Sequence, residues 1–362
     1  MSQAKPPAPP SRLQRLRRVV PFAGAGLLLA YFAWTADLSA AAAAVGQADI
    51  ALVVAVLLLG TGVTWIFDSL CLVWLIEVTL GGRGRPGGAG LREMAPLKAA
   101  SYVLNIINYN AATLGMAWVV SRRKAVGFIE SAAALAVLSY LDLVALAGLV
   151  VAGLIVAPET FAGHADIQQA MTWTAASIFA VAVVLLLLLQ SRLSLGPLER
   201  LRSLSIVRPL AALSPSRMLV GVALRAAFVM CYVVIHYWMM RAFGMSPTWG
   251  SLLVIVPVLT VVGVVPISVS GIGTTQVLAR TLYAAFVTDG RPADPVIDAW
   301  STLTIFGFIL VRVLLALPFL SRIQDEVRTR PTDTGSASDV AQSATETVGG
   351  RPDAAGPEAP TR

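Results

Sequence analysis

The stretch PVLTVVGVVPISVSGIGTTQVLARTLYAAF, from Pro257 to Phe286, decides how this chain can fold. An apolar helical pattern runs up to Pro266, which lacks a backbone donor and ends the helix. Two serines and two glycines follow before a second helical pattern begins at Thr274. Irregular backbone is not tolerated where it faces lipid, so a break at membrane depth must be buried in protein or line a cavity. The stretch therefore predicts a broken membrane segment of the kind found at transporter binding sites. A surface loop that joins two helices is the alternative.

The composition is that of a polytopic membrane protein. Of the 362 residues, 57% are hydrophobic and 13% are charged, and the mean hydropathy is +0.76. A soluble domain with so few charges would be an outlier. The excess of 27 Lys and Arg over 20 Asp and Glu indicates basic cytoplasmic loops and not a nucleic-acid-binding surface. Two cysteines in apolar runs and two histidines predict no disulfide framework, no metal site and no cofactor.

Charge and hydropathy divide the chain into three parts. Residues 1–18 are rich in proline and then basic, which predicts a cytoplasmic flank. Residues 19–322 hold the apolar segments and form the predicted transmembrane domain. Residues 323–362 are rich in Thr, Ser, Gly, Pro and Ala, which predicts a disordered cytoplasmic tail.

Six apolar segments are predicted to cross the bilayer, for which about 20 residues suffice. They are Val19–Ala36, Ile50–Leu80, Ala125–Val156, Met171–Gln190, Met218–Met240 and Val296–Leu320. The loops at 37–49 and 158–169 contain no Lys or Arg and fit the outside, whereas the basic loops Gly81–Lys98 and Ser191–Arg217 fit the cytoplasm. An even number of spans keeps both termini cytoplasmic, and the predicted location is the plasma membrane.

A further apolar segment, Ala99–Val120, is followed directly by Arg122, Arg123 and Lys124. If this segment crossed the bilayer, three positive charges would lie outside, against the positive-inside rule. The segment also contains three asparagines. We therefore predict a re-entrant segment that enters from the cytoplasm and returns there. A plain span with an Asn-rich interface is the alternative.

The predicted fold is an all-α polytopic integral membrane protein with about six to eight transmembrane helices and two re-entrant or broken membrane segments. The Asn-rich segment would enter from inside, and the break at Pro266–Gly273 from outside. Opposed excursions are typical of carriers built from inverted repeats, although the sequence shows no convincing repeat. The count reaches eight if each excursion is a full hairpin.

Charged side chains inside the apolar segments are candidates for function. A carboxylate at the bilayer centre costs roughly 2.5–3.5 kcal/mol on insertion scales, so Asp142 and Asp68 should have partners. A role in function or gating and a purely structural ion pair are both open for them. Arg280 lies inside the helix that follows the glycine break. Arg225 and Arg312 lie nearer the cytoplasmic ends of their spans, where long side chains can snorkel to the surface.

These features together suggest a cavity for an anionic headgroup, such as the phosphate of a lipid. The helix that opens after the glycines offers unpaired N–H groups and the positive end of its dipole to an anion. Glycines let a ligand approach the backbone closely. Arg280 would add positive charge, and the Asn-rich segment would add hydrogen bonds from the opposite side. The predicted substrate-binding residues are Asn105, Asn108, Asn110, Asp142, Ser270, Gly271, Gly273, Thr274 and Arg280.

Three features carry a resemblance to a known family. They are the Pro-x-x-x-x-Gly-x-Gly segment Pro266–Gly273, the Asn-rich segment from Asn108 to Gly115, and Asp142 in the following helix. They resemble the transmembrane region of lysylphosphatidylglycerol synthases, also found as stand-alone flippase-like membrane proteins. The resemblance covers roughly residues 20–322. It departs at Gln276 and Met116, where the family often carries acidic residues.

The sequence and the resemblance favour a flippase-like protein that moves, or helps to move, a lipid with an anionic or sugar-bearing headgroup between leaflets. The lipid would be a phospholipid or a polyprenyl-phosphate-linked one. No ATP-binding loop of the Gly-x-x-x-x-Gly-Lys-Ser/Thr type is found. The synthases carry a soluble aminoacyltransferase domain, for which this chain shows no pattern, so we expect no aminoacyl transfer. Two alternatives stay open: a non-transporting partner of a glycosyltransferase or lipid synthase, and an intramembrane enzyme acting on lipid headgroups.

Overall fold

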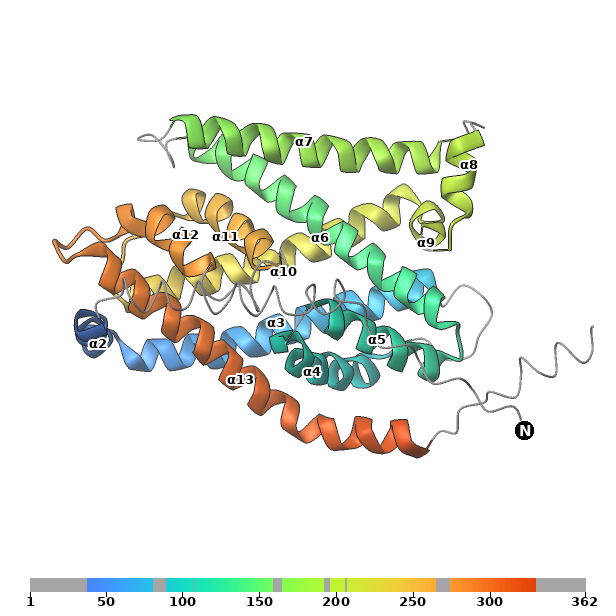
Figure 1. The fold of residues 1–362 in the computed structure, drawn as a ribbon, viewed down its shortest axis with the longest axis horizontal. Helices are drawn as coiled ribbons and strands as arrows, with labels where there is room; N and C mark the ends of the chain where they lie inside the picture. Colours follow the sequence, from blue (N-terminus) through green and yellow to red (C-terminus); the bar gives the residue numbers. More distant parts are fainter. Residues whose placement is uncertain are drawn as a thin grey trace, which may run out of the picture. The chain divides into compact units, whose positions relative to one another are not determined.

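The computed structural model describes residues 38–80, 89–107, 109–158, 165–191, 196–205, 207–264 and 274–329. Within these residues all regular structure is helical and no strand is present (Figure 1). The predicted span Val19–Ala36 and the break at Pro266–Gly273 lie outside the described residues, as does most of each predicted terminal segment.

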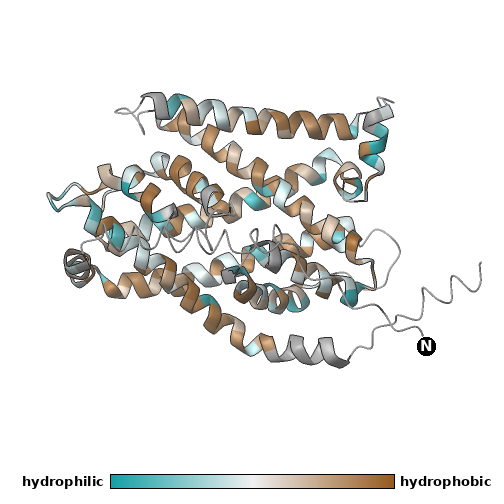
Figure 2. Ribbon diagram, in the orientation of Figure 1, coloured by the Kyte–Doolittle hydropathy of each residue, from teal (hydrophilic) through white to brown (hydrophobic). Residues whose placement is uncertain are grey.

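Five of the described helices are long and apolar enough to cross a membrane, which confirms an all-α polytopic membrane protein. They are α3 (Ile50–Thr79), α6 (Phe128–Val156), α7 (Ala165–Gln190), α10 (Pro215–Ala242) and α13 (Ala293–Thr329). In α7 and α13 the apolar spans are Gln168–Gln190 and Ala293–Leu320. Each helix matches a predicted span, and Figure 2 shows that hydrophobic residues predominate along these helices.

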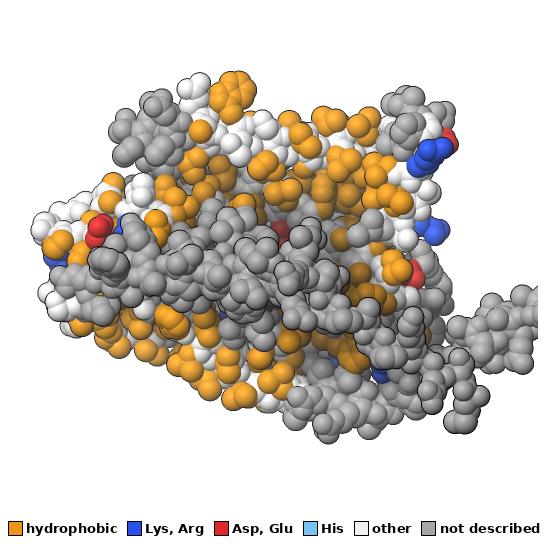
Figure 3. Space-filling model, in the orientation of Figure 1, with side chains coloured by type: hydrophobic (Ala, Val, Ile, Leu, Met, Phe, Trp, Pro, Cys, Tyr) orange, Lys and Arg blue, Asp and Glu red, His pale blue; other side chains and the backbone are white. Residues whose placement is uncertain are grey.

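The spans present apolar side chains outward. Leu59 on α3 and Leu219 on α10 are each 71% exposed, which is the arrangement expected of side chains that face lipid. Figure 3 shows apolar side chains spread over the visible face of the helices. The inner faces are close-packed instead, with Leu72 and Met239 fully buried.

The centre of the fold is formed by α10, which packs along both α3 and α6. Gly221 permits this contact on α10, because a Cβ atom there would lie 2.4 Å from the Trp74 ring and 2.8 Å from Leu141. The helix α7 packs on the outside of α6. The shorter helices are α2 (Leu38–Gln47), α8 (Gly196–Ser203) and α9 (Arg208–Ala211).

The helices α4 (Leu91–Ile107) and α5 (Tyr109–Lys124) pack against each other as a hairpin. The last residue of α5 meets the start of α4, since Lys124 Nζ lies 2.9 Å from Glu93 Oε2. The chain therefore turns back between α4 and α5 and returns to the end at which α3 stops and α6 begins. This reversal agrees with the predicted excursion, whose depth in a membrane stays a prediction. The helix α4 begins at Leu91, inside the segment Gly81–Lys98 that the sequence predicted to be a cytoplasmic loop. The helix extends into this segment because Met94 and Leu97 are buried by packing.

A second hairpin is formed by α11 (Trp249–Val264) and α12 (Thr274–Tyr283), which is followed by the short helix η4 (Ala284–Phe286). The amide of Ser246 donates to the carbonyl of Phe286 at 2.8 Å, so the two outer ends of this hairpin meet. They meet at the end where α10 stops and α13 begins.

The two hairpins approach from opposite ends of the central spans. The amide of Asp49, at the start of α3, donates to the carbonyl of Ala242, at the end of α10, at 2.8 Å. The second hairpin therefore lies at the beginning of α3, and the first hairpin lies at its far end. The sequence span, hairpin, span occurs twice in inverted orientation, once as α3 to α6 and once as α10 to α13.

Candidate functional site

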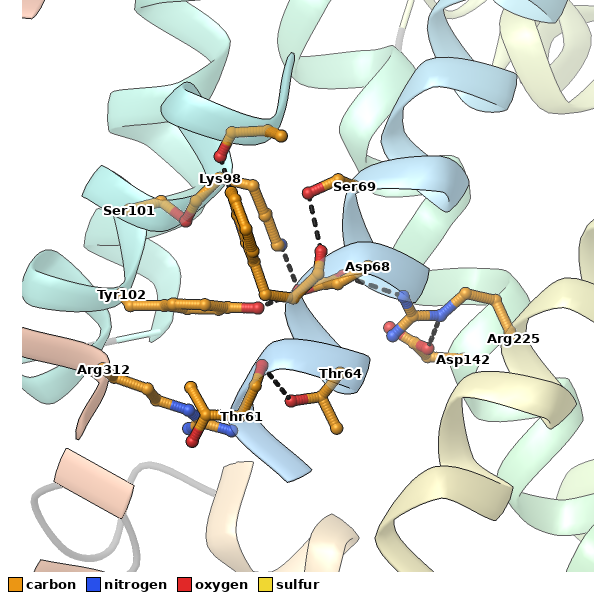
Figure 4. A network of polar contacts seen from close by, with 12 residues as sticks. Thr61, Thr64, Asp68, Ser69, Lys98, Ser101, Tyr102, Asp142, Arg225 and Arg312 are labelled. Atoms are coloured by element: carbon orange, nitrogen blue, oxygen red, sulfur yellow. Dashed lines mark hydrogen bonds and ion pairs between the residues drawn. The ribbon is translucent and has the colours of Figure 1, made fainter. Parts of the chain in front are cut away.

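Four charged side chains from four helices meet inside the helix bundle (Figure 4). Asp68 on α3 lies 3.0 Å from Lys98 Nζ on α4 and 3.1 Å from Arg225 Nη1 on α10. The Nε of Arg225 donates to Asp142 Oδ1 on α6. Asp68 and Arg225 are each only 5% exposed. The network joins the first hairpin to three of the spans.

The pairing explains how these charges are tolerated. An isolated charge inside a membrane protein is costly, whereas an ion pair with further hydrogen bonds recovers much of that cost. Tyr102 adds a hydrogen bond to Asp68 at 3.3 Å, and the Arg225 guanidinium lies 4.2 Å from the centre of the Phe228 ring. Arg225 is thus buried in the network, although its position near a span end had suggested snorkelling.

A third cation, Arg312 on α13, adds an excess of positive charge. Its Nη2 donates to the Tyr232 hydroxyl at 2.7 Å, and its guanidinium lies 5.1 Å from the centre of the Tyr102 ring. Its Nε is buried without a hydrogen-bond partner, and no described carboxylate forms an ion pair with it. The hydroxyl of Thr61 is likewise buried and unpartnered. Together the three cations and two carboxylates leave a net charge of 3 − 2 = +1, which suits an anionic ligand.

A small cavity of about 20 Å³ opens between α4, α5 and α6. Its lining includes Lys98, Ser101, Asn105, Thr113, Met116 and Ser139. A cavity of this size holds a water molecule but not a lipid headgroup, so a headgroup would require the hairpin to move. Lys98 belongs both to the cavity wall and to the charged network, and it therefore links the two.

The second hairpin carries an ion pair of its own. Arg280 on α12 donates from Nε and Nη2 to the two carboxylate oxygens of Asp298 on α13, each at 2.7 Å. The Asp298 side chain is 3% exposed. Beside this pair, the rings of Tyr283 and Trp300 pack edge to face, and the hydroxyl of the one and the indole N–H of the other are buried without partners. The two hydrogen bonds between Arg280 and Asp298 anchor α12 to the last span, α13.

Three of the predicted site residues have side chains that the structure describes, and they lie in three different places. Asn105 lines the cavity, Asp142 belongs to the charged network, and Arg280 forms the pair of the second hairpin. The remaining predicted residues, or their side chains, lie outside the described part of the chain; they are Asn108, Asn110, Ser270, Gly271, Gly273 and Thr274.

Two charged residues of the site were missed from the sequence. Lys98 was assigned to a cytoplasmic loop, although it directly precedes the apolar run that starts at Ala99. Asp298 was overlooked, although it lies near the start of the last apolar segment. An ionisable residue at either edge of an apolar run was the available signal. Within the described residues, no three His, Cys, Asp or Glu side chains converge as metal ligands would.

Comparison with known proteins gives one match. The family model described as "Lysylphosphatidylglycerol synthase TM region" matches residues 18–316, which is most of the chain. No curated protein and no solved structure matches the chain.

Proposed function

The chain belongs to the family of the lysylphosphatidylglycerol synthase transmembrane region, and from this premise we propose that it moves, or helps to move, a lipid with an anionic or sugar-bearing headgroup between leaflets. The observation that carries the proposal is the pair of helical hairpins that approach from opposite ends of the central spans. Each hairpin is held by an ion pair, Lys98 with Asp68 in the first and Arg280 with Asp298 in the second.

Such an arrangement suits alternating access. In carriers with inverted repeats, a site between two broken segments opens first to one side of the membrane and then to the other. Opening of the first hairpin would separate Lys98 from Asp68, and opening of the second would separate Arg280 from Asp298. A ligand that binds the opened form more tightly than the closed form would shift the population toward opening. An anion does so, because it replaces the carboxylate as the partner of the released cation.

The excess positive charge of the interior supports an anionic headgroup. Arg312 lacks a described carboxylate partner and retains an unpartnered buried Nε–H. The acyl chains of a lipid would stay in the bilayer beside the apolar faces of the spans while the headgroup crosses. We further propose a plasma-membrane location with both termini in the cytoplasm. The basic residues Arg122, Arg123 and Lys124 in the last turn of α5 support this orientation, because such residues favour the cytoplasmic side.

A translocation assay tests this function. Purified protein is placed in liposomes that contain headgroup-labelled anionic phospholipids or polyprenyl-phosphate sugars, with and without a pH gradient. We expect transfer between leaflets by the wild type, a strong loss in Arg280→Ala and Asp142→Asn, and no loss in the control Arg241→Gln, which changes an exposed cation at the end of α10. Lack of transfer under every condition would reject the proposal in favour of a non-transporting partner protein. A chemically altered lipid would instead indicate an enzyme.

A further inference from the structure

We propose, on the basis of the proposed function, that the cavity between α4, α5 and α6 is a headgroup subsite for a phosphate attached to a polyol. By the same chemistry it disfavours a cationic aminoacylated headgroup such as lysylphosphatidylglycerol. The shared ligand chemistry is present in phosphatidylglycerol and in polyprenyl-phosphate sugars. The subsite has Lys98 as its charged anchor and Met116 in its wall.

The charge of the lining carries this inference first. Lys98 is a cation, and among the described residues no carboxylate lines the cavity. A phosphate oxygen placed beside Lys98 Nζ would form a charge-assisted hydrogen bond, which is stronger than one between neutral groups. A lysyl headgroup carries the same phosphate, but its two ammonium groups would then lie close to Lys98 in a lining that contains no described carboxylate. Like-charge contacts of this kind oppose binding.

The two carboxylates of the nearby network do not offer an alternative partner to a cationic headgroup. Asp68 is already paired with both Lys98 and Arg225, and Asp142 is paired with Arg225. An incoming amine would have to displace one of these cations and leave it buried without a partner, which is costly. Met116 is 5% exposed, and its thioether cannot neutralise a cation.

An incoming phosphate is accommodated by exchange of partners. Lys98 would leave Asp68 for the phosphate, and Asp68 would keep Arg225 at 3.1 Å and the Tyr102 hydroxyl at 3.3 Å. No charge is then left without a partner. The exchange also removes the ion pair between α4 and α3, although the Tyr102 hydrogen bond to Asp68 still joins the two helices. Binding would thus loosen the first hairpin and enlarge the cavity from about 20 Å³.

The remaining lining suits the hydroxyl groups of a polyol. Ser101, Thr113 and Ser139 contribute hydroxyls, and Asn105 contributes an amide. Hydroxyl and amide groups can each donate and accept hydrogen bonds, as the hydroxyls of a polyol require of their partners. Ser101 donates to the carbonyl of Lys98 at 2.7 Å, which leaves its oxygen able to accept.

Lipid binding to the purified full-length protein, followed by native mass spectrometry, tests the subsite separately from transport. The probes are phosphatidylglycerol, a polyprenyl-phosphate sugar and lysylphosphatidylglycerol. We expect at least one of the first two to bind about tenfold or more tightly than the lysyl lipid, and the stronger of them identifies the lipid source. Lys98→Gln should weaken phosphate-lipid binding by about tenfold or more, as expected for a lost charged hydrogen bond. Lys98→Arg should retain it, and Lys124→Gln, which removes an ion pair outside the cavity, should not change it.

A second variant leaves the Lys98–Asp68 pair in place. Met116→Glu should raise the affinity for lysylphosphatidylglycerol relative to phosphatidylglycerol, whereas Met116→Leu should not. Equal or tighter binding of the lysyl lipid by the wild type, or unchanged phosphatidylglycerol binding by folded Lys98→Gln, would overturn the inference. Phosphate-lipid binding that depends on Lys98, without translocation, would support the subsite and reject the proposed function. Translocation together with lipid binding that does not depend on Lys98 would reject the subsite but not the proposed function.

Discussion

Asp68 Oδ1 on α3 and Arg225 Nη1 on α10 lie 3.1 Å apart, although 157 residues separate them in the chain. The two residues belong to equivalent helices, because α3 and α10 each open one of the two inverted span–hairpin–span units. Their contact therefore joins the two units at the centre of the fold. Lys98 extends the same contact to the first hairpin.

Removal of this central cation should destabilise the protein strongly. Arg225→Met keeps much of the side-chain volume but leaves Asp68 and Asp142 without the guanidinium. Loss of one partner of a buried pair costs about 3–5 kcal/mol, because an uncompensated charge remains. Thermal unfolding of the purified variant in detergent should show a clearly lower midpoint. An unchanged midpoint would show that the network contributes nothing to stability.

A double-mutant cycle on Arg280 and Asp298 separates structural from ligand-binding roles. Each single alanine substitution should lower stability, since the remaining partner loses its charged hydrogen bonds. The double substitution should be less destabilising than the sum, by about 0.5–3 kcal/mol of coupling. If Arg280 also contacts the lipid, translocation should stay lost in the double variant despite the recovered stability. Recovery of both properties would leave Arg280 a purely structural role.

The packing of α10 makes a prediction about two glycines. A Cβ at Gly221 would lie 2.4 Å from the Trp74 ring, whereas a Cβ at Gly62 on α3 would meet nothing within 4 Å. Gly221→Ala should therefore destabilise by about 1–3 kcal/mol through overpacking. Gly62→Ala should be neutral or slightly stabilising, because alanine favours helix over glycine. Similar unfolding midpoints for the two variants would contradict this packing.

An acidic pH should weaken the contact of Arg291 with Asp289 and with the Phe243 carbonyl, which we call the clasp and which lies near the second hairpin. The hydrogen bond from Arg291 holds the pKa of the Asp289 carboxyl below its usual range. Arg291 also donates to the carbonyl of Phe243 at 2.6 Å. Because the folded-state pKa is depressed, the clasp stabilises the protein above the usual carboxyl pKa of about 3.9 and loses this effect as pH falls through the folded-state value. The midpoint difference between wild type and Asp289→Asn should therefore shrink from pH 7 to pH 3. A constant difference would contradict the role of the carboxylate.

The membrane spans could be predicted from the sequence, because hydropathy and loop charge are local properties. The five described spans agree with predicted ones to within a few residues. The reversal between α4 and α5 followed from Arg122, Arg123 and Lys124, whose charges forbid a simple outward crossing. The start of α4 at Leu91 was missed, because packing of Met94 and Leu97 overrides the loop-like glycines and charges before it.

The pairing of charges could not be predicted, because it depends on which helices become neighbours. Asp142 and Asp68 were recognised as residues in need of partners, but nothing local identifies Arg225 as the cation that contacts both. Lys98 and Asp298 lie at the edges of apolar runs, where a charge has several structural explanations. Their roles emerge only from the contacts of α4 with α3 and of α12 with α13.

The most direct test of the account is translocation by a protein whose second hairpin can be locked. A Cβ at Gly153 on α6 would lie 2.9 Å from Leu253 Cβ on α11. This is shorter than the roughly 3.5–4.5 Å of a disulfide, so the two helices must move slightly apart when the bond forms. Gly153→Cys with Leu253→Cys is made with Cys71→Ala and Cys231→Ala, beside each single-cysteine control. We predict that the reduced protein moves lipid between leaflets, that oxidation stops transfer only in the paired variant, and that reduction restores it. Undiminished transfer by the fully cross-linked protein would contradict movement of the second hairpin as a required step of transport.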